Sequence, residues 1–176
     1  GLTDAQVRKD LAYFGQFGHP GIGYRVEELV TRIRCILGTD RNWNVLLVGA
    51  GNLGSALLSY RGFSKKGFQI VAVFDNDKNK IGQRIGPERK LEIIGIDRLA
   101  AVIAERDIQM AIISIPAEQA QPVADALVAA GIKAILNFAP ASLTIPESVP
   151  MASVDLAVHL EQLAFRISAN QLANNK

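Results

Sequence analysis

The chain contains very little cysteine and histidine. Its 176 residues include one cysteine, Cys35, and two histidines, His19 and His159. A lone cysteine cannot form a disulfide within the chain, which fits a reducing compartment. We expect no metal site, because these three side chains do not make a metal-binding cluster. Cys35 lies between Ile33 and Ile36 in a helical pattern, and we predict that it fills a core.

Long hydrophobic runs and a strong charge of one sign are also missing. The most apolar stretch, Met110 to Pro116, is far shorter than a membrane span, and no signal peptide is recognisable. We therefore expect a soluble cytoplasmic protein without a membrane partner. Charged residues make up 20% of the chain and the net charge is +2, so composition alone does not argue for nucleic-acid binding. The hydrophobic fraction of 49% is sufficient for a sizeable core.

The sequence pattern changes near residues 38–44. Before this point, the capping box Thr3-Asp4-Ala5-Gln6 predicts a helix that begins at Thr3. Its buried face should contain Val7, Leu11 and Phe14, which follow at helical spacing. Residues 15–24 contain four glycines and a proline and predict a short β-hairpin. A second helix is predicted over residues 26–37, with Gly38 as its C-cap.

After Asn44 the pattern alternates between strands and helices. Continuous apolar runs predict strands that are buried on both faces of a sheet. We expect strands near 44–49, 69–75, 92–96, 110–115 and 133–137, an edge strand at 151–154, and helices near 52–60, 97–106 and 117–130. The predicted fold class is α/β, with a doubly wound, mostly parallel sheet of the Rossmann type.

The last predicted helix runs from Asp155, which can cap it, to about Leu172. Its apolar residues form two stripes: Leu156, Leu160, Leu163 and Ile167 in one, Val158 and Phe165 in the other. A helix that is apolar on two faces needs cover on both. Its own domain can cover one face, and a partner subunit could cover the other.

A glycine-rich motif follows the first strand of the α/β region. It reads Gly49-Ala50-Gly51-Asn52-Leu53-Gly54, opens a helix, and is followed by a second strand that ends at Asp75. Gly49 permits a tight turn, Gly51 lets the backbone approach a diphosphate, and Gly54 lets the helix pack close to the strand. The motif predicts a dinucleotide site in which backbone N–H groups hold the phosphates. The alternative is a glycine-rich turn without a ligand.

Asp75 lies 21 residues after Gly54. A carboxylate at this position accepts hydrogen bonds from the adenosine ribose hydroxyls and repels a 2′-phosphate. No arginine follows immediately, so NAD(H) is favoured over NADP(H). The alternative is an acid that is only solvated at a strand end.

The loops after two later strands should line the nicotinamide end of the site. The predicted contacts are Ile115, Pro116, Phe138, Ala139 and Pro140. Ordinary turn chemistry is the alternative, because proline often follows a strand. These segments are largely apolar and should favour the uncharged reduced ring, so NADH is the preferred ligand.

We find no catalytic constellation. A dehydrogenase needs an acid or base for the substrate proton, and no Tyr-x-x-x-Lys pair is present. About 130 residues form the nucleotide fold, which leaves no substrate domain. Binding without turnover is the simpler interpretation, and the alternatives are a small NAD-dependent oxidoreductase or a CoA-binding module.

Three features together indicate a family. They are residues 3–15, the turn Gly18-His19-Pro20-Gly21-Ile22-Gly23-Tyr24, and the GxGxxG unit some 25 residues later. In these features the chain resembles the Rex redox-sensing transcriptional repressors. The resemblance covers almost the whole chain and extends to Tyr60-Arg61-Gly62-Phe63, Phe74-Asp75-Asn76-Asp77 and Asn137-Phe138-Ala139-Pro140.

The resemblance implies a homodimer that represses respiratory and fermentative genes and releases operator DNA when NADH binds. It implies a partial winged-helix DNA-binding domain over residues 1–40, an NAD(H)-binding domain over 41–154 and a dimer-exchange helix over 155–176. Two helices that precede the recognition helix in the family are not in this sequence. We therefore do not expect stable operator binding by these 176 residues alone.

The resemblance also implies roles for individual residues. The helix from Ala5 to Phe14 would be the recognition helix, and the glycine-rich hairpin would be the wing. Tyr60 and Asp155 match positions of a redox-dependent contact across the dimer, although a packed tyrosine and an N-cap aspartate are the plain alternatives. The implied DNA contacts, which could otherwise be a solvated polar face, are Gln6, Arg8, Lys9, Tyr13, His19 and Tyr24.

Overall fold

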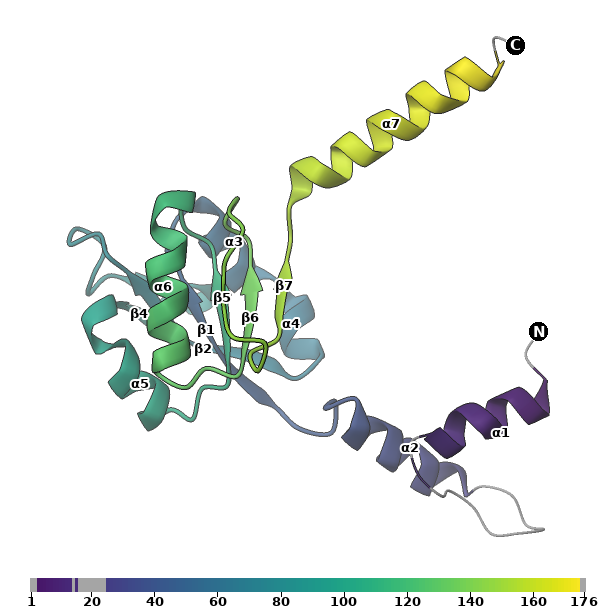
Figure 1. Ribbon diagram of the computed structural model, residues 1–176. Coiled ribbons are helices and arrows are strands. Elements are labelled where there is room, and N and C mark those ends of the chain that lie inside the picture. The colour runs from purple at the N-terminus through teal and green to yellow at the C-terminus, as the bar shows by residue number, and fades with distance from the viewer. Residues whose placement is uncertain (1–2, 14, 16–24, 175–176) are drawn as a thin grey trace. The chain divides into compact units, whose positions relative to one another are not determined.

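The structure is a computed structural model that describes residues 3–13, 15 and 25–174. The chain divides into two compact units, Gly1–Asn42 and Trp43–Lys176, and each is described by itself. The first unit contains helices α1 (Asp4–Tyr13) and α2 (Val26–Ile36). The second contains the sheet and the remaining helices (Figure 1). Most of the hairpin predicted for residues 15–24 lies outside the described residues.

Both caps that the sequence predicts for the first unit are confirmed. The hydroxyl of Thr3 accepts a hydrogen bond from the backbone N–H of Gln6 at 3.3 Å, as an N-cap does. After α2, Gly38 adopts a φ of 63°, and the N–H of Thr39 donates to the carbonyl of Arg34 at 2.8 Å. This is the glycine-terminated arrangement that ends many helices.

The burial predicted for Val7 and Cys35 in the first unit is wrong, while the side chains of Leu11 and Phe14 lie outside the described residues. Val7 is 41% exposed, and Cys35, predicted to fill a core, is exposed. No residue of α2 is buried, and its apolar Val26 and the C-cap residue Leu37 are both exposed. Two short helices enclose too little volume for a core, so an apolar stripe alone does not bury its members.

The second unit is built on a seven-stranded sheet with the order β3-β4-β2-β1-β5-β6-β7. All neighbouring pairs are parallel except β3 and β4, which are antiparallel. The predicted doubly wound sheet is thereby confirmed, including its edge strand β7. The strands are β1 (Trp43–Val48), β2 (Phe68–Asp75), β3 (Arg84–Ile85), β4 (Leu91–Gly95), β5 (Met110–Ile113), β6 (Ala134–Asn137) and β7 (Met151–Ser153).

Helices cover both faces of this sheet (Figure 1). Helices α5 (Leu99–Glu105) and α6 (Ala117–Ala129) pack on the face that contains Leu46 and Phe74. Helices α3 (Asn52–Ser59) and α4 (Arg61–Lys65) pack on the other face. Single turns of 3₁₀ helix, η1 (Pro87–Arg89) and η2 (Ile96–Arg98), complete the elements. The sequence pattern missed α4 and β3, which are too short to show a periodicity.

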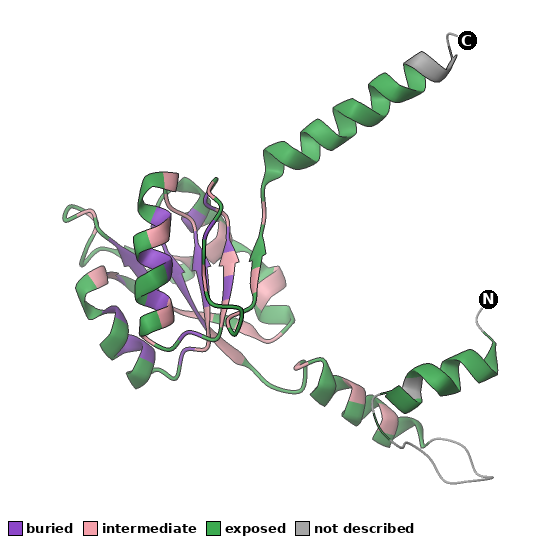
Figure 2. Ribbon diagram, in the orientation of Figure 1, coloured by how far each residue is buried: buried purple, intermediate pink, exposed green. Residues whose placement is uncertain are grey.

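The core lies in the central strands, which Figure 2 shows in purple. In β1, Leu46 and Val48 face one apolar cluster while Val45 and Leu47 face the other, and all four are buried. A strand that is buried on both faces must be apolar at every position, which explains the continuous run in the sequence.

The chain ends in α7 (Leu156–Asn174), which follows β7. Asp155 caps this helix as predicted, because its Oδ1 accepts the backbone N–H groups of Ala157 at 2.9 Å and Val158 at 3.2 Å. Every side chain described between 155 and 171 is exposed. In the described part of the chain, no helix is both long enough and apolar enough to cross a membrane.

Candidate functional site

Four loops meet at one edge of the sheet. They follow the carboxyl ends of β1, β2, β5 and β6, which are parallel strands in adjacent positions. Backbone hydrogen bonds extend the strand pairing into the loops: Gly49 N–H donates to Phe74, Ser114 N–H to Val48, and Phe138 N–H to Ile113. Since β2 lies on one side of β1 and β5 on the other, the strand order reverses direction here, and ligands of such sheets bind at this point.

Gly49 and Gly54 hold the turn between β1 and α3 in a tight form. Gly49 has a φ of 103°, and a Cβ atom there would lie 2.8 Å from Cγ2 of Ile115 and would also overlap the carbonyl of Ser114. A Cβ atom at Gly54 would overlap the carbonyl of Gly49. Both positions therefore require glycine for the packing of the protein itself.

Gly51 is different, because a Cβ atom there would meet no atom of the protein within 4 Å. Its φ of −81° is also open to other residues. Gly51 is the N-cap of α3, and Gly51, Asn52 and Leu53 are exposed while Ala50 is buried. The open backbone at this helix N-terminus leaves space and N–H groups for an anionic group, so these residues fit a diphosphate.

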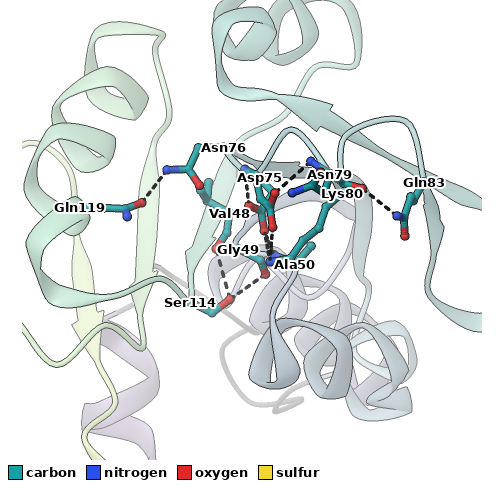
Figure 3. A network of polar contacts seen from close by, with 11 residues as sticks. Val48, Gly49, Ala50, Asp75, Asn76, Asn79, Lys80, Gln83, Ser114 and Gln119 are labelled. Atoms are coloured by element: carbon teal, nitrogen blue, oxygen red, sulfur yellow. Dashed lines mark hydrogen bonds and ion pairs between the residues drawn. The ribbon is translucent and has the colours of Figure 1, made fainter.

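Asp75, the last residue of β2, is only 7% exposed. Its Oδ2 accepts the N–H of Ala50 at 2.8 Å, and its Oδ1 accepts the N–H of Asp77 at 2.9 Å. The predicted ribose-binding acid thus lies against the glycine-rich turn, as Figure 3 shows. Its hydrogen bond with Ala50 also links that turn to β2, a structural role that the sequence did not reveal.

Lys80 gives Asp75 a third partner that the sequence analysis missed. Its Nζ lies 3.2 Å from Oδ2 of Asp75 and 3.9 Å from Oδ2 of Asp77. Burial raises the pKa of Asp75, but the N–H groups of Asp77 and Ala50 together with Lys80 outweigh it, and the net pKa lies below its usual value. The carboxylate is therefore charged at neutral pH.

Two buried or half-buried polar side chains shape the other loops, and the sequence analysis overlooked their roles. The Ser114 hydroxyl donates towards the carbonyls of Val48 and Gly49, at 3.2 and 3.1 Å. Asn137 is fully buried and donates to the carbonyls of Ala139 and Ala141 while it accepts the N–H of Ala139. The sequence signal that could have revealed these roles is a polar residue at the end of an apolar strand.

The residues predicted for the nicotinamide end lie in these same loops. Ala139 is buried, Ile115 and Phe138 are half-buried, and Pro116 and Pro140 are exposed. All five side chains are apolar, so the loops after β5 and β6 are largely apolar at this edge of the sheet. Their contact with a nicotinamide ring stays a prediction.

Asn76 and Gln119 join the loop after β2 to the first turn of α6. The amide nitrogen of Asn76 donates to Oε1 of Gln119 at 2.8 Å (Figure 3). Both side chains are exposed, so the bond can open without exposing a buried polar group.

Three of the four predicted DNA-contact residues on α1 share one side of this helix, and Arg8 flanks it. Gln6, Lys9 and Tyr13 follow at helical spacing, and all three are exposed. Gln6 donates to Asp10 at 2.9 Å, and the guanidinium of Arg8 donates to the carbonyl of Asp4 at 3.3 Å. His19 and Tyr24 lie outside the described residues.

The predicted switch residues, Tyr60 and Asp155, are both exposed. Tyr60 lies between α3 and α4, and its ring meets that of Phe63 edge to face with centroids 5.1 Å apart. A Cβ atom at Gly62 would overlap the Tyr60 ring, so the glycine makes room for it. Asp155 is the N-cap of α7. Tyr60 thus packs against Phe63 and Asp155 caps a helix, as the two alternatives to a switch role require. The switch role of both residues stays a prediction.

An apolar hollow of about 430 Å³ lies on the α4 side of the sheet. Tyr60 and Phe63 form one wall, and Met110 and Leu136 contribute the part from β5 and β6. Helices α3 and α4 therefore cover that face of the sheet incompletely.

Among the described residues, no group of three or more His, Cys, Asp or Glu side chains could hold a metal ion. Arginine does not contact Asp75, whose described side-chain partner is Lys80.

Comparison with a family model places residues 40–141 in the CoA binding domain family. This range includes the glycine-rich turn, Asp75 and the loops after β5 and β6. The family shares the predicted Rossmann-like architecture.

Curated relatives extend the similarity to nearly the whole chain. The chain is 54% identical over 167 residues to the redox-sensing transcriptional repressor Rex of Carboxydothermus hydrogenoformans, a match that covers 95% of this chain and 79% of the relative. It is 50% identical over 167 residues to the Rex protein of Pelotomaculum thermopropionicum, with 95% of this chain and 77% of the relative covered.

Solved structures of a Rex-family repressor, RSP, are also similar. The complex of RSP with β-NAD⁺ and operator DNA matches with a TM-score of 0.83 and 39% identity, over 99% of this chain and 79% of RSP. The complex of RSP with β-NADH matches with a TM-score of 0.77 and 38% identity, over 99% and 80% of the two chains.

Proposed function

The chain belongs to the family of Rex redox-sensing transcriptional repressors, and we propose that its second unit senses NADH at the carboxyl ends of β1, β2, β5 and β6. RSP, a relative of known structure, binds both β-NAD⁺ and β-NADH. The close relatives are named as repressors, so this chain is a regulator and not an enzyme. Its partner is operator DNA, as for RSP.

One observation carries the assignment of the nucleotide site. Gly51 opens α3 with free space beside its Cα atom, and a charged, nearly buried Asp75 lies against the neighbouring Ala50. The backbone N–H groups at Gly51–Leu53 would hold the diphosphate, and Asp75 would accept the ribose hydroxyls. These roles fit residues 41–154 as an NAD(H)-binding domain.

We assign the preference for NADH to the apolar loops after β5 and β6. Bound nicotinamide carries a positive ring charge when oxidised and none when reduced. Burying the charge without a partner is costly, so Ile115, Phe138 and Ala139 would favour the reduced form.

Helix α7 is proposed to mediate a homodimer. Its Leu160, Leu163 and Phe165 are 67%, 54% and 73% exposed. The same chain presents an apolar hollow beside Tyr60 and Phe63 that α3 and α4 do not fill. Packing α7 of a second copy over that hollow would cover both apolar surfaces at once.

Signalling follows if NADH binds the DNA-incompetent dimer more tightly than the DNA-binding dimer. A near-complete switch needs a difference of about 5.5 kcal/mol, which two bound nucleotides can share. Residues 1–40 would supply the DNA contacts through Gln6, Arg8, Lys9 and Tyr13, with His19 and Tyr24 in the wing. Tyr60 and Asp155 are the proposed contact that differs between the two states.

Operator release by the two nicotinamide forms tests this function. The full-length protein is bound to a labelled DNA selected from a random pool, and NADH or NAD⁺ is titrated into the complex. We expect NADH to release the DNA at a much lower concentration than NAD⁺. Equal release by both forms would contradict redox sensing.

CoA is the alternative ligand, because residues 40–141 match the CoA binding domain family. CoA carries a phosphate on its ribose, which Asp75 would repel. We therefore expect calorimetry to detect NADH binding and no CoA binding at the same concentration. The reverse result would replace the proposed ligand.

A further inference from the structure

The carboxylate of Asp75 already has three protein donors. Oδ2 accepts from Ala50 N–H at 2.8 Å and from Lys80 Nζ at 3.2 Å, and Oδ1 accepts from Asp77 N–H at 2.9 Å. A carboxylate offers about four acceptor positions. One position is therefore left, on Oδ1, whereas a ribose that donates from both hydroxyls needs two.

Lys80 is the donor that can give way. The N–H groups of Ala50 and Asp77 are fixed by the backbone of their turns. The Lys80 side chain is 38% exposed and has a rotatable four-carbon stem, so its ammonium can leave Oδ2 and keep water or Asp77 as a partner. Figure 3 shows this side chain lying alongside Asp75 and reaching the oxygen that also faces Ala50.

The charge of Lys80 then matters for a phosphorylated ribose. Asp75 and Asp77 bring two carboxylates to this corner, and Lys80 brings an ammonium within 4 Å of both. A 2′-phosphate adds further negative charge that the carboxylates repel. An ammonium released from Asp75 would be available to pair with that phosphate.

Building on the proposed NADH site, we propose that Lys80 is a specificity-determining residue: it weakens the discrimination against 2′-phosphorylated nucleotides that Asp75 imposes. Removal of the ammonium leaves two uncompensated carboxylates at the ribose end. NADPH binding should then suffer strongly. NADH binding should change little, because its ribose hydroxyls gain an acceptor position as the pair with Lys80 is lost.

The test measures the dissociation constants of NADH and NADPH for the wild type and for Lys80→Met, Lys80→Arg and Lys78→Met. Lys78 lies in the same loop and is exposed, so K78M is the matched control for loss of one positive charge nearby. We expect the ratio Kd(NADPH)/Kd(NADH) to rise about tenfold in K80M, the size of one charge-assisted hydrogen bond. It should stay within about twofold of wild type in K78M and K80R.

The outcomes separate this inference from the function on which it rests. An unchanged ratio in K80M, with NADH binding retained, overturns the role of Lys80 and leaves the NADH site intact. Equal weakening of both nucleotides in K80M also overturns it, because it makes Lys80 a support for the loop alone. If wild-type protein binds neither nucleotide, the proposed function fails first.

Discussion

The sheet of the second unit and helix α7 contain the same kinds of apolar residue but bury them very differently. Phe74 in β2 is 0% exposed, whereas Phe165 in α7 is 73% exposed. Both faces of the central strands are covered by helices of the same chain. In contrast, every described side chain of α7 is exposed. The edge proposed to bind the nucleotide is thus organised by a single copy, and α7 needs another surface before its apolar side chains are removed from water.

The largest effect is expected from charges placed on α7. The double substitution Leu160→Asp with Phe165→Asp removes two large apolar side chains, each contributing roughly 1.5–3 kcal/mol when buried. In a symmetric dimer the loss occurs twice, so the dimer dissociation constant should rise more than about a thousandfold. Analytical ultracentrifugation measures the assembly.

Gln162→Asp is the control, because it adds a charge to the same helix without removing an apolar side chain. Hydrogen exchange of β1 should stay slow in the double variant, since its core lies within one chain. A dimer of unchanged strength would contradict the role of α7.

The next effect contrasts two glycines of one turn. Gly49→Ala places a Cβ against Ser114 and Ile115 at a φ of 103°, and should lower the free energy of unfolding by about 3 kcal/mol. Gly51→Ala meets no atom within 4 Å and should cost less than about 1 kcal/mol. Chemical denaturation measures both.

The same pair separates stability from binding. The new methyl group of G51A would occupy the space left for the diphosphate, and we expect NADH affinity to fall roughly a hundredfold. Fluorescence titration of NADH measures this loss. Wild-type affinity in G51A would show that the nucleotide does not approach this backbone.

A smaller effect is expected from Asp75→Asn, which keeps the shape and removes the charge. Hydrogen bonds to a charged group are stronger, so the substitution should lower the free energy of unfolding by about 2 kcal/mol at pH 7. Because folding lowers the pKa of Asp75, the ionised carboxylate stabilises the fold above its usual pKa.

The pH dependence follows from this direction. The contribution of Asp75 decreases as pH falls below the usual value of 3.8 and is lost below the lower pKa of the folded state. Wild type and D75N should therefore converge in stability at acid pH. A difference that stays constant from pH 7 to that range would show that the charge is not the cause.

The smallest effect on stability is expected from Asp155→Asn. Asparagine caps helices about as well as aspartate, so α7 should lose less than about 0.5 kcal/mol. If the charge of Asp155 takes part in the switch, the NADH concentration that releases operator DNA should still change several-fold. An unaltered release curve would show that Asp155 only caps α7 and takes no part in the switch.

The sequence predicted most of the second unit because its patterns are local. Apolar runs marked β1 and β5, and the GxGxxG motif with Asp75 marked the turn after β1, where the nucleotide is predicted to bind. The motif did not show that Asp75 holds Ala50 or that Lys80 pairs with it, since these contacts depend on how two loops meet. Asn137 was passed over for the same reason.

The sequence misled where burial depends on what surrounds a helix. The position of Cys35 between two isoleucines predicted a core that two short helices do not provide. In contrast, the two apolar stripes of α7 correctly indicated surfaces that need cover, but the expectation that its own domain covers one of them is wrong, because every side chain described between 155 and 171 is exposed. Periodicity identifies an apolar face, and the neighbouring elements decide whether that face is buried.

Isothermal titration calorimetry of NADH and NAD⁺ into wild-type protein tests the central claim most directly. The account predicts saturable binding of NADH, one nucleotide per chain, with a lower dissociation constant than that of NAD⁺. The absence of heat with either form, at concentrations well above the cellular range, would contradict a nucleotide site at Gly49–Gly54 and Asp75.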